Sequence, residues 1–154
     1  KFMYQNGLSH IHERNEGGWS PICYAAISGN PMLLASLLDQ KADVNDNITQ
    51  VEDLFHFNAG TRIVHMCAHL RHNDALRLLI GARADLQTKD GWEASAIHWA
   101  ALAGNAEGIQ ILRSAGCSPT DANLLGYLPF TLAAMSPSNT VATMQELLQD
   151  TPSS

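Results

Sequence analysis

The sequence is poor in charged residues and has no block of basic residues. Charged residues make up 16% of the 154 residues, and the formal net charge is −6. A nucleic-acid-binding surface needs clustered Lys and Arg, and an anionic membrane surface attracts the same residues. The composition therefore argues against both classes of partner. Apolar residues make up 45%, which predicts a folded chain with a core.

Cysteine is also scarce. Cys23, Cys67 and Cys117 are an odd number and contain no C-x-x-C pair, so they do not form a disulfide framework. We therefore expect an intracellular, reducing compartment, and the sequence does not distinguish cytoplasm, nucleus and organelle interior. The chain begins with Lys1 and has no signal-peptide pattern, so we expect it to be part of a longer or processed protein.

The stretch from Ser20 to Leu38 has no charged residue and nearly reaches the length of a transmembrane helix. A Gly-Asn-Pro sequence stands in its middle at residues 29–31, and a Ser-Pro pair opens it. Ser and Asn are preferred helix N-caps, and Pro suits the first helical position. The stretch therefore predicts two short helices. Each is too short to span a membrane and too apolar to be stable alone.

Four segments of the sequence repeat one another. SPICYAAISGN from Ser20 aligns with RIVHMCAHLRH from Arg62, SAIHWAALAGN from Ser95 and LPFTLAAMSPS from Leu128, so the starts differ by 42, 33 and 33 residues. The sequence KADVN at 41–45 recurs as RADLQ at 83–87. A period of 33 residues that contains two short helices and a turn is the pattern of a stacked repeat array.

These units resemble ankyrin repeats. The family's T-P-L-H-x-A-A sequence is matched at residues 20–26 and 95–101, and its glycine between the helices by Gly29 and Gly104. The resemblance implies an all-α solenoid whose first helices and turn tips form a concave face. We expect one domain, residues 1–154, with a remnant of an earlier unit at the N-terminus (residues 8–18). The four expected units cover about 16–48, 58–90, 91–123 and 124–150.

The sequence departs from the repeat pattern in several places. Nine additional residues fall between the first two units, where Thr49 to Glu52 form a capping-box pattern. The insertion at 46–57 therefore predicts a short extra helix that projects from the turn side. Cys23 and Thr131 stand where the family has His, so we expect the hydrogen bond of that His to be lost or altered. The last helix has polar residues, as a terminal cap requires.

Few residues are candidates for chemistry. His65, His69 and His72 share one face of a predicted helix, and histidines arranged in this way could bind zinc. The resemblance gives His65 and His72 structural roles, which leaves only His69 unexplained. Some ankyrin repeats are hydroxylated at an Asn in the setting of Asn45, although the simpler interpretation is that Asn45 holds its own turn. We predict no catalytic, metal-binding or cofactor-binding residue.

The remaining candidate is the surface that the array builds. Free positions at the turn tips and after the Ala-Ala pair are unusually apolar. The predicted partner-binding residues are Trp19, Ile27, His69, Leu70, Trp92, Leu102, Leu125, Tyr127 and Met135. Internal packing between turn tips is an equal alternative for Trp19 and Trp92.

These positions predict a protein–protein interaction module, a scaffold or adaptor, that binds a protein partner. A stable peripheral subunit of a larger assembly, organellar or membrane-associated, is the second interpretation. A small metal-binding or catalytic domain is the rival from another class and has less support.

Overall fold

The structure, a computed structural model, describes residues 10–138 and 141–149. Within these residues it is all-helical, with two isolated β-bridges in the loops. The helices form four pairs: α2 (Pro21–Ser28) with α3 (Pro31–Asp39), α4 (Ile63–His69) with α5 (Asn73–Gly81), α6 (Ala96–Leu102) with α7 (Ala106–Ser114), and α8 (Pro129–Met135) with α9 (Val141–Leu148). Each expected unit contains one pair, and the predicted solenoid is confirmed.

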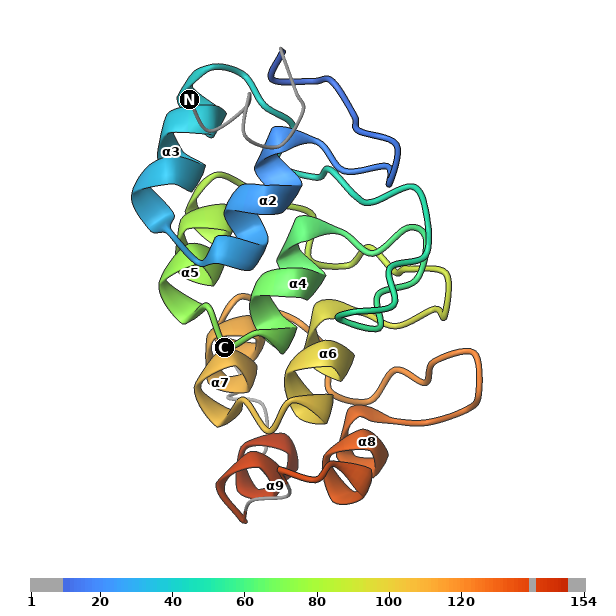
Figure 1. Ribbon diagram of the computed structural model, residues 1–154. Coiled ribbons are helices and arrows are strands. Elements are labelled where there is room, and N and C mark those ends of the chain that lie inside the picture. The colour runs from blue at the N-terminus through green and yellow to red at the C-terminus, as the bar shows by residue number, and fades with distance from the viewer. Residues whose placement is uncertain (1–9, 139–140, 150–154) are drawn as a thin grey trace.

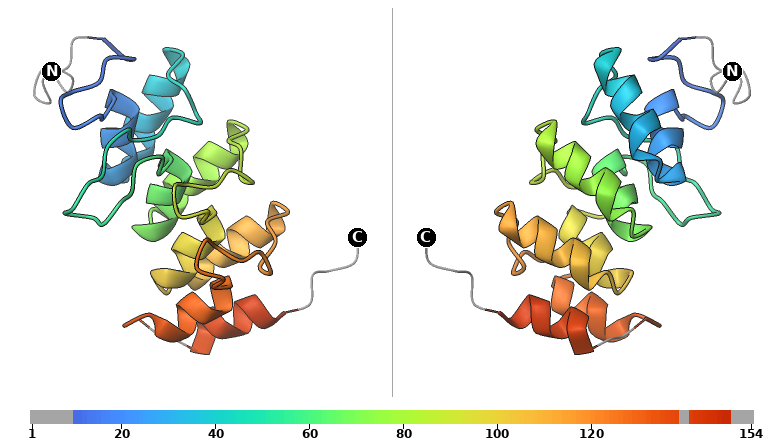
Figure 2. Two further views of the ribbon diagram at one scale, coloured as in Figure 1. Left: turned by 90° about the vertical axis from the view of Figure 1, so that its right-hand side faces the viewer. Right: turned by 90° about the vertical axis from the view of Figure 1, so that its left-hand side faces the viewer.

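The helices form two layers (Figure 1). The first helices of the pairs, α2, α4, α6 and α8, contact one another in order, and the second helices, α3, α5, α7 and α9, do the same. Loops that precede the first helices project to one side, on the right in Figure 1. We call these loops fingers. The two side views in Figure 2 show the pairs stacked in chain order from α2 to α9.

Small residues in the first helices allow this close stacking. The alanines at 25, 26, 68, 100 and 101 are fully buried between neighbouring helices. Gly29 ends α2 in the left-handed conformation, at a φ of 69°. A Cβ atom there would lie 2.4 Å from the His72 ring, whose Nε2 lies 3.0 Å from the Ile27 carbonyl oxygen. This position therefore needs glycine both for its φ and for the approach of the next unit.

The histidines of the second and third units tie each helix start to the next finger. In α6, His98 Nδ1 accepts from the Ser95 backbone N–H at 3.1 Å. Its Nε2 therefore carries the proton, and it donates to the Tyr127 carbonyl oxygen at 3.3 Å. His65 makes the same two contacts, to Arg62 and to the Thr88 carbonyl oxygen.

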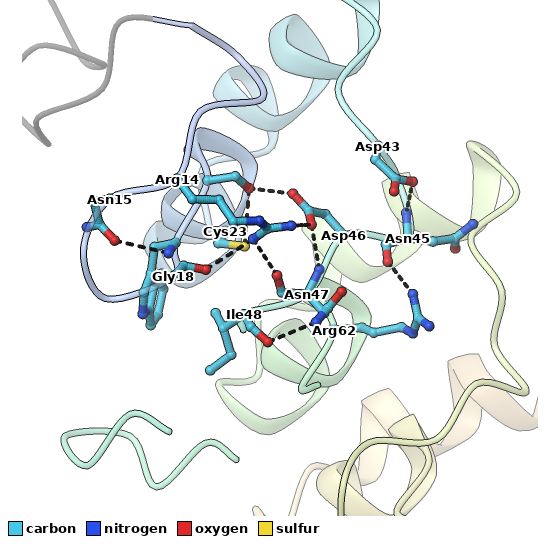
Figure 3. Close-up of polar contacts among 12 residues, drawn as sticks. Arg14, Asn15, Gly18, Cys23, Asp43, Asn45, Asp46, Asn47, Ile48 and Arg62 are labelled. Atoms are coloured by element: carbon cyan, nitrogen blue, oxygen red, sulfur yellow. Dashed lines mark hydrogen bonds and ion pairs between the residues drawn. The ribbon is translucent and has the colours of Figure 1, made fainter. Parts of the chain in front are cut away.

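The first unit, which has Cys23 in the His position, uses a different connection (Figure 3). Asp46 receives a hydrogen bond from Ser20 and an ion pair from Arg14. Arg14 also donates to the carbonyl oxygens of Gly18 and Asn47, at 3.0 and 2.7 Å. A buried serine and carboxylate, together with a partly exposed guanidinium, thus replace the histidine contact, as expected for an altered bond.

The predicted helix in the insertion is wrong. Residues 46–57 form an irregular excursion that is closed by two antiparallel pairings, Asn47 with Arg62 and Glu52 with Phe57. The Glu52 carboxylate accepts from the backbone N–H groups of Leu54 and Phe55, so it caps a turn. Phe57 is fully buried. The chain reverses direction to bury Phe57. The residues after the capping-box pattern therefore form a turn and not a helix.

The two ends of the array differ from expectation in detail. Leu8 and Ser9 of the expected N-terminal remnant, and Asp150 of the last unit, lie outside the described residues. Residues 10–19 form turns and no helix. In α9, Gln145 is exposed as expected, but Val141 and Leu148 are also 70% and 68% exposed. None of the helices within 10–138 and 141–149 has the length and apolar composition of a membrane span.

Candidate functional site

Finger residues fall into two columns, one that points outward and one that packs inward. In the third finger (residues 90–94) and the fourth finger (residues 123–127), Trp92 and Leu125 occupy equivalent outward positions and are 50% and 59% exposed. Ala94 and Tyr127 occupy the equivalent inward positions. Trp19 stands in this inward column and is only 6% exposed, with its ring 5.2 Å from that of Tyr24. The expectation of an exposed anchor at Trp19 is therefore wrong, and its internal-packing alternative is correct.

Asp90 organises the third finger. Its Oδ1 accepts from the backbone N–H groups of Trp92 and Ala94, at 2.8 and 3.0 Å. Its Oδ2 accepts from the Trp99 indole at 2.7 Å and from the Asn58 amide at 3.1 Å. One buried carboxylate therefore fixes the finger tip, the preceding finger and helix α6 relative to one another.

Asn123 has the same role in the fourth finger. Its Oδ1 accepts from the backbone N–H groups of Leu125 and Tyr127, at 3.0 and 2.9 Å. The Leu124 backbone N–H donates across to the Trp92 carbonyl oxygen at 2.8 Å, so the third and fourth finger tips are bonded side by side. This bond holds two exposed leucines, 124 and 125, next to Trp92.

A pocket of about 360 Å³ lies between these fingers and the first-helix layer. Its lining is mostly apolar and aromatic, with a few polar side chains. The lining residues are His56, Asn58, His69, Trp92, Ala94, His98, Trp99, Leu102, Asn123, Leu125, Tyr127 and Leu132. They come from the insertion, from three fingers and from helices α4, α6 and α8, so the pocket exists only when the units are stacked.

The insertion supports one wall of this pocket. The Phe57 ring meets the rings of Trp99 and His69 edge to face, with centroids 5.6 and 6.0 Å apart, and it stacks on Phe55. The centroids of the His69 and Trp99 rings are 5.1 Å apart. Edge-to-face pairs of this kind stabilise beyond their buried area. Burial lowers the pKa of His69, which favours the neutral ring in this cluster.

The structure brings five of the nine predicted partner-binding residues together. These five line the pocket: His69, Trp92, Leu102, Leu125 and Tyr127. Met135, the last residue of α8, is 60% exposed and lies outside the pocket lining. Ile27 and Leu70 are half-buried against the core and also lie outside the lining.

Sequence reasoning missed Asp90, Trp99 and Phe57. A signal existed for Asp90, because it begins an Asp-Gly turn just before a helix start, where a carboxylate accepts backbone N–H groups. Trp99 occupies a variable position of the helix motif and was not singled out. No sequence signal identified Phe57, because its contacts are to residues 69 and 99.

The three histidines of the cluster contact different neighbours. His65 and His72 contact the carbonyl oxygens of Thr88 and Ile27, and His69 lies in the aromatic cluster. Within the described part of the chain, no group of three or more His, Cys, Asp or Glu side chains is placed to hold a metal ion.

The cysteines are poor nucleophiles. Burial raises the pKa of Cys67 to about 12 and that of Cys117 to about 11, and it also raises the pKa of Cys23. The thiolate is the reactive form, so these thiols are inert near neutral pH.

Asn45 links two hairpins. Its side-chain oxygen accepts from the Asp85 backbone N–H at 2.7 Å, and its own backbone N–H donates to Asp43 at 2.9 Å. The interpretation that Asn45 holds its own turn is wrong, because its side chain bonds the hairpin of the next unit and the Asp43 side chain holds the turn.

Comparisons with known proteins agree with this architecture. The family described as ankyrin repeats (3 copies) matches residues 64–153, which is more than half of the chain. The chain belongs to the ankyrin-repeat family. The tyrosine-protein kinase Shark of Drosophila melanogaster is 29% identical to it over 130 residues, which is 82% of this chain and 13% of the kinase. Ankyrin repeats are generally protein–protein interaction modules and are typically non-catalytic.

Proposed function

We propose that this ankyrin array binds a protein partner through the groove between its third and fourth fingers and helices α4, α6 and α8. The observation that carries this proposal is the exposure of Trp92, Leu124 and Leu125, at 50%, 61% and 59%, beside an apolar pocket. Exposed apolar patches of this kind mark interaction sites. Trp is among the residues that most often dominate binding energy when a partner excludes water.

The hydrogen bonds of the groove favour binding without large rearrangement. Asp90 and Asn123 hold the two finger tips, and the Leu124 N–H joins them. Rigid, pre-positioned side chains lose less conformational entropy on binding than mobile ones. The groove therefore suits a scaffold or adaptor that accepts a segment of its partner.

One observation favours the second form, a stable subunit of a larger assembly. The last helix pair exposes further large apolar side chains, with Phe130 at 36%, Met135 at 60% and Val141 at 70%. A partner that covered this end permanently would remove that surface from water. We also propose a reducing, intracellular compartment, because the three thiols are free and buried.

Affinity capture with the full chain, followed by mass spectrometry, tests the groove. We expect Trp92→Ala and Leu125→Ser to lose a partner that the wild-type chain retains. Met32→Ser is the matched control, because Met32 is 82% exposed on α3, away from the fingers. A partner that is retained by both groove variants and lost by Met32→Ser would overturn the proposal.

A further inference from the structure

The pocket of this chain has a wall that the repeat pattern does not supply. His56 of the insertion lines it directly, and Phe57 is packed behind it on Trp99 and His69. The other three units have no equivalent insertion. The insertion therefore adds a wall to the pocket, whose volume of about 360 Å³ suits a large side chain.

A buried carboxylate, Asp90, holds the Trp99 wall of this pocket in place without itself lining the pocket. Four N–H donors converge on the Asp90 carboxylate, so each of its oxygens accepts two hydrogen bonds. No salt bridge to Asp90 occurs among the described residues. The Trp99 indole donates one of the four hydrogen bonds, so its ring is polarised by the carboxylate. Ring faces carry negative potential and attract cations and the positive edges of other aromatic rings.

Exposed acidic residues neighbour several of the pocket-lining residues. Glu93, next to Trp92, is exposed, and so is Asp53 in the insertion. Burial lowers the pKa of His98, and the exposed Asp121 opposes that shift whereas Lys89 adds to it, so both charges lie near this pocket residue. Carboxylates therefore outnumber ammonium groups among these neighbours, and the whole chain has a net charge of −6.

We infer that the pocket takes one aromatic side chain from a basic segment of the partner. The inference rests on the proposed function. The positive edge of the incoming ring meets the face of Trp99 or Trp92, and Lys or Arg residues on either side of it meet the carboxylates of Glu93, Asp121 and Asp53. Complementary charge speeds the encounter and selects the partner, and the aromatic anchor supplies the buried apolar area.

Fluorescence polarisation with synthetic peptides tests this inference on the full chain. Two labelled libraries carry a fixed central Phe or Trp, one with Lys and Arg on both sides and one with Asp and Glu. We expect the basic library to bind about tenfold or more tightly than the acidic one, and this ratio to fall as salt is added. Trp92→Ala should reduce binding of the basic library, whereas Met32→Ser should not.

Charge reversal sharpens the test. The double variant Glu93→Lys, Asp121→Lys should lower the preference for basic flanks, and it leaves the apolar lining intact. Equal binding of the two libraries, or stronger binding of the acidic one, would overturn the inference. So would failure of every peptide to bind.

The captured partner separates this inference from the proposed function. A partner that is lost on Trp92→Ala but has no aromatic residue within a basic segment sinks the inference and leaves the groove function standing. A partner whose binding is unchanged by all groove substitutions would contradict the proposed function itself.

Discussion

The third and fourth units carry the same repeat, but their equivalent side chains have different neighbours. Ile97 in α6 is 1% exposed, whereas Phe130 at the same position of α8 is 36% exposed. Ala101 is fully buried, whereas Ala134 is exposed. Figure 1 shows the reason, because α6 lies between α4 and α8, whereas α8 is the last of the first helices within the described residues.

This difference shows that a repeat residue is buried by the unit that follows it. Nearest-neighbour interfaces supply much of the stability of such arrays. The same residue type should therefore be costly to change in the third unit and cheap to change in the fourth.

The largest expected effect comes from the same substitution in the two second helices. Leu112→Ala in α7 removes a fully buried side chain and should cost about 2–5 kcal/mol of unfolding free energy through the cavity it leaves. Leu148→Ala in α9 changes a side chain that is 68% exposed and should cost about 0.5 kcal/mol or less. Urea denaturation measures both. Similar costs would show that α9 is covered in solution.

A second pair tests close approach between the first helices. Ala101→Leu should cost about 1–3 kcal/mol, because the added carbons have no room between α6 and its neighbours. Ala134→Leu should leave stability nearly unchanged, because the Ala134 side chain is exposed. Thermal melts of the two variants give the comparison. An unaffected Ala101→Leu variant would contradict the predicted tight contact.

The repeat period allowed the helix pairs to be predicted, because capping residues, small residues and turn glycines recur at fixed offsets. The groove was predicted in part for the same reason, since Trp92, Leu125 and Tyr127 occupy recurring finger positions. The inward or outward direction of a finger residue was not predicted for Trp19. It depends on contact with the helix behind the finger, here with Tyr24.

The helix predicted for the insertion was wrong for a related reason. Thr49 and Glu52 have the local spacing of a capping box, but tertiary contacts determine the path. Ile48 is fully buried and its N–H donates to the Thr61 carbonyl oxygen at 3.0 Å, while Phe57 is buried against His69 and Trp99. A segment held at both ends by buried residues has to turn back between them.

The third prediction concerns pH. Burial lowers the pKa of His65 to about 4, against the opposing influence of Asp90 and the Thr88 carbonyl. With an unfolded value near 6.5, the unfolded chain binds more protons between these values. The contribution of His65 to the free energy of unfolding is therefore fully present above about pH 6.5 and is lost as the pH falls towards 4. The fourth unit has Thr131 in this position and does not contribute.

Urea denaturation across this pH range should show a loss of about 1–2 kcal/mol between about pH 6.5 and pH 5. His65→Gln should be less stable at neutral pH, but its profile should be flatter. An equally steep profile in that variant would assign the pH dependence to other groups.

The smallest effect is expected from an exchange of the two residues at the His position. His98→Thr should cost about 1 kcal/mol or more, because the Ser95 N–H and the Tyr127 carbonyl oxygen lose their partner. Thr131→His should change stability by about 0.5 kcal/mol or less. A histidine there would find no following finger within the described residues to accept its Nε2–H, and Leu128 offers no hydroxyl at the helix start. The two single variants and the wild-type chain can be compared by urea denaturation at neutral pH. A clear gain in unfolding free energy for Thr131→His would show that this histidine stabilises its own helix start. The hydrogen bond from such a histidine to the next finger would then add little.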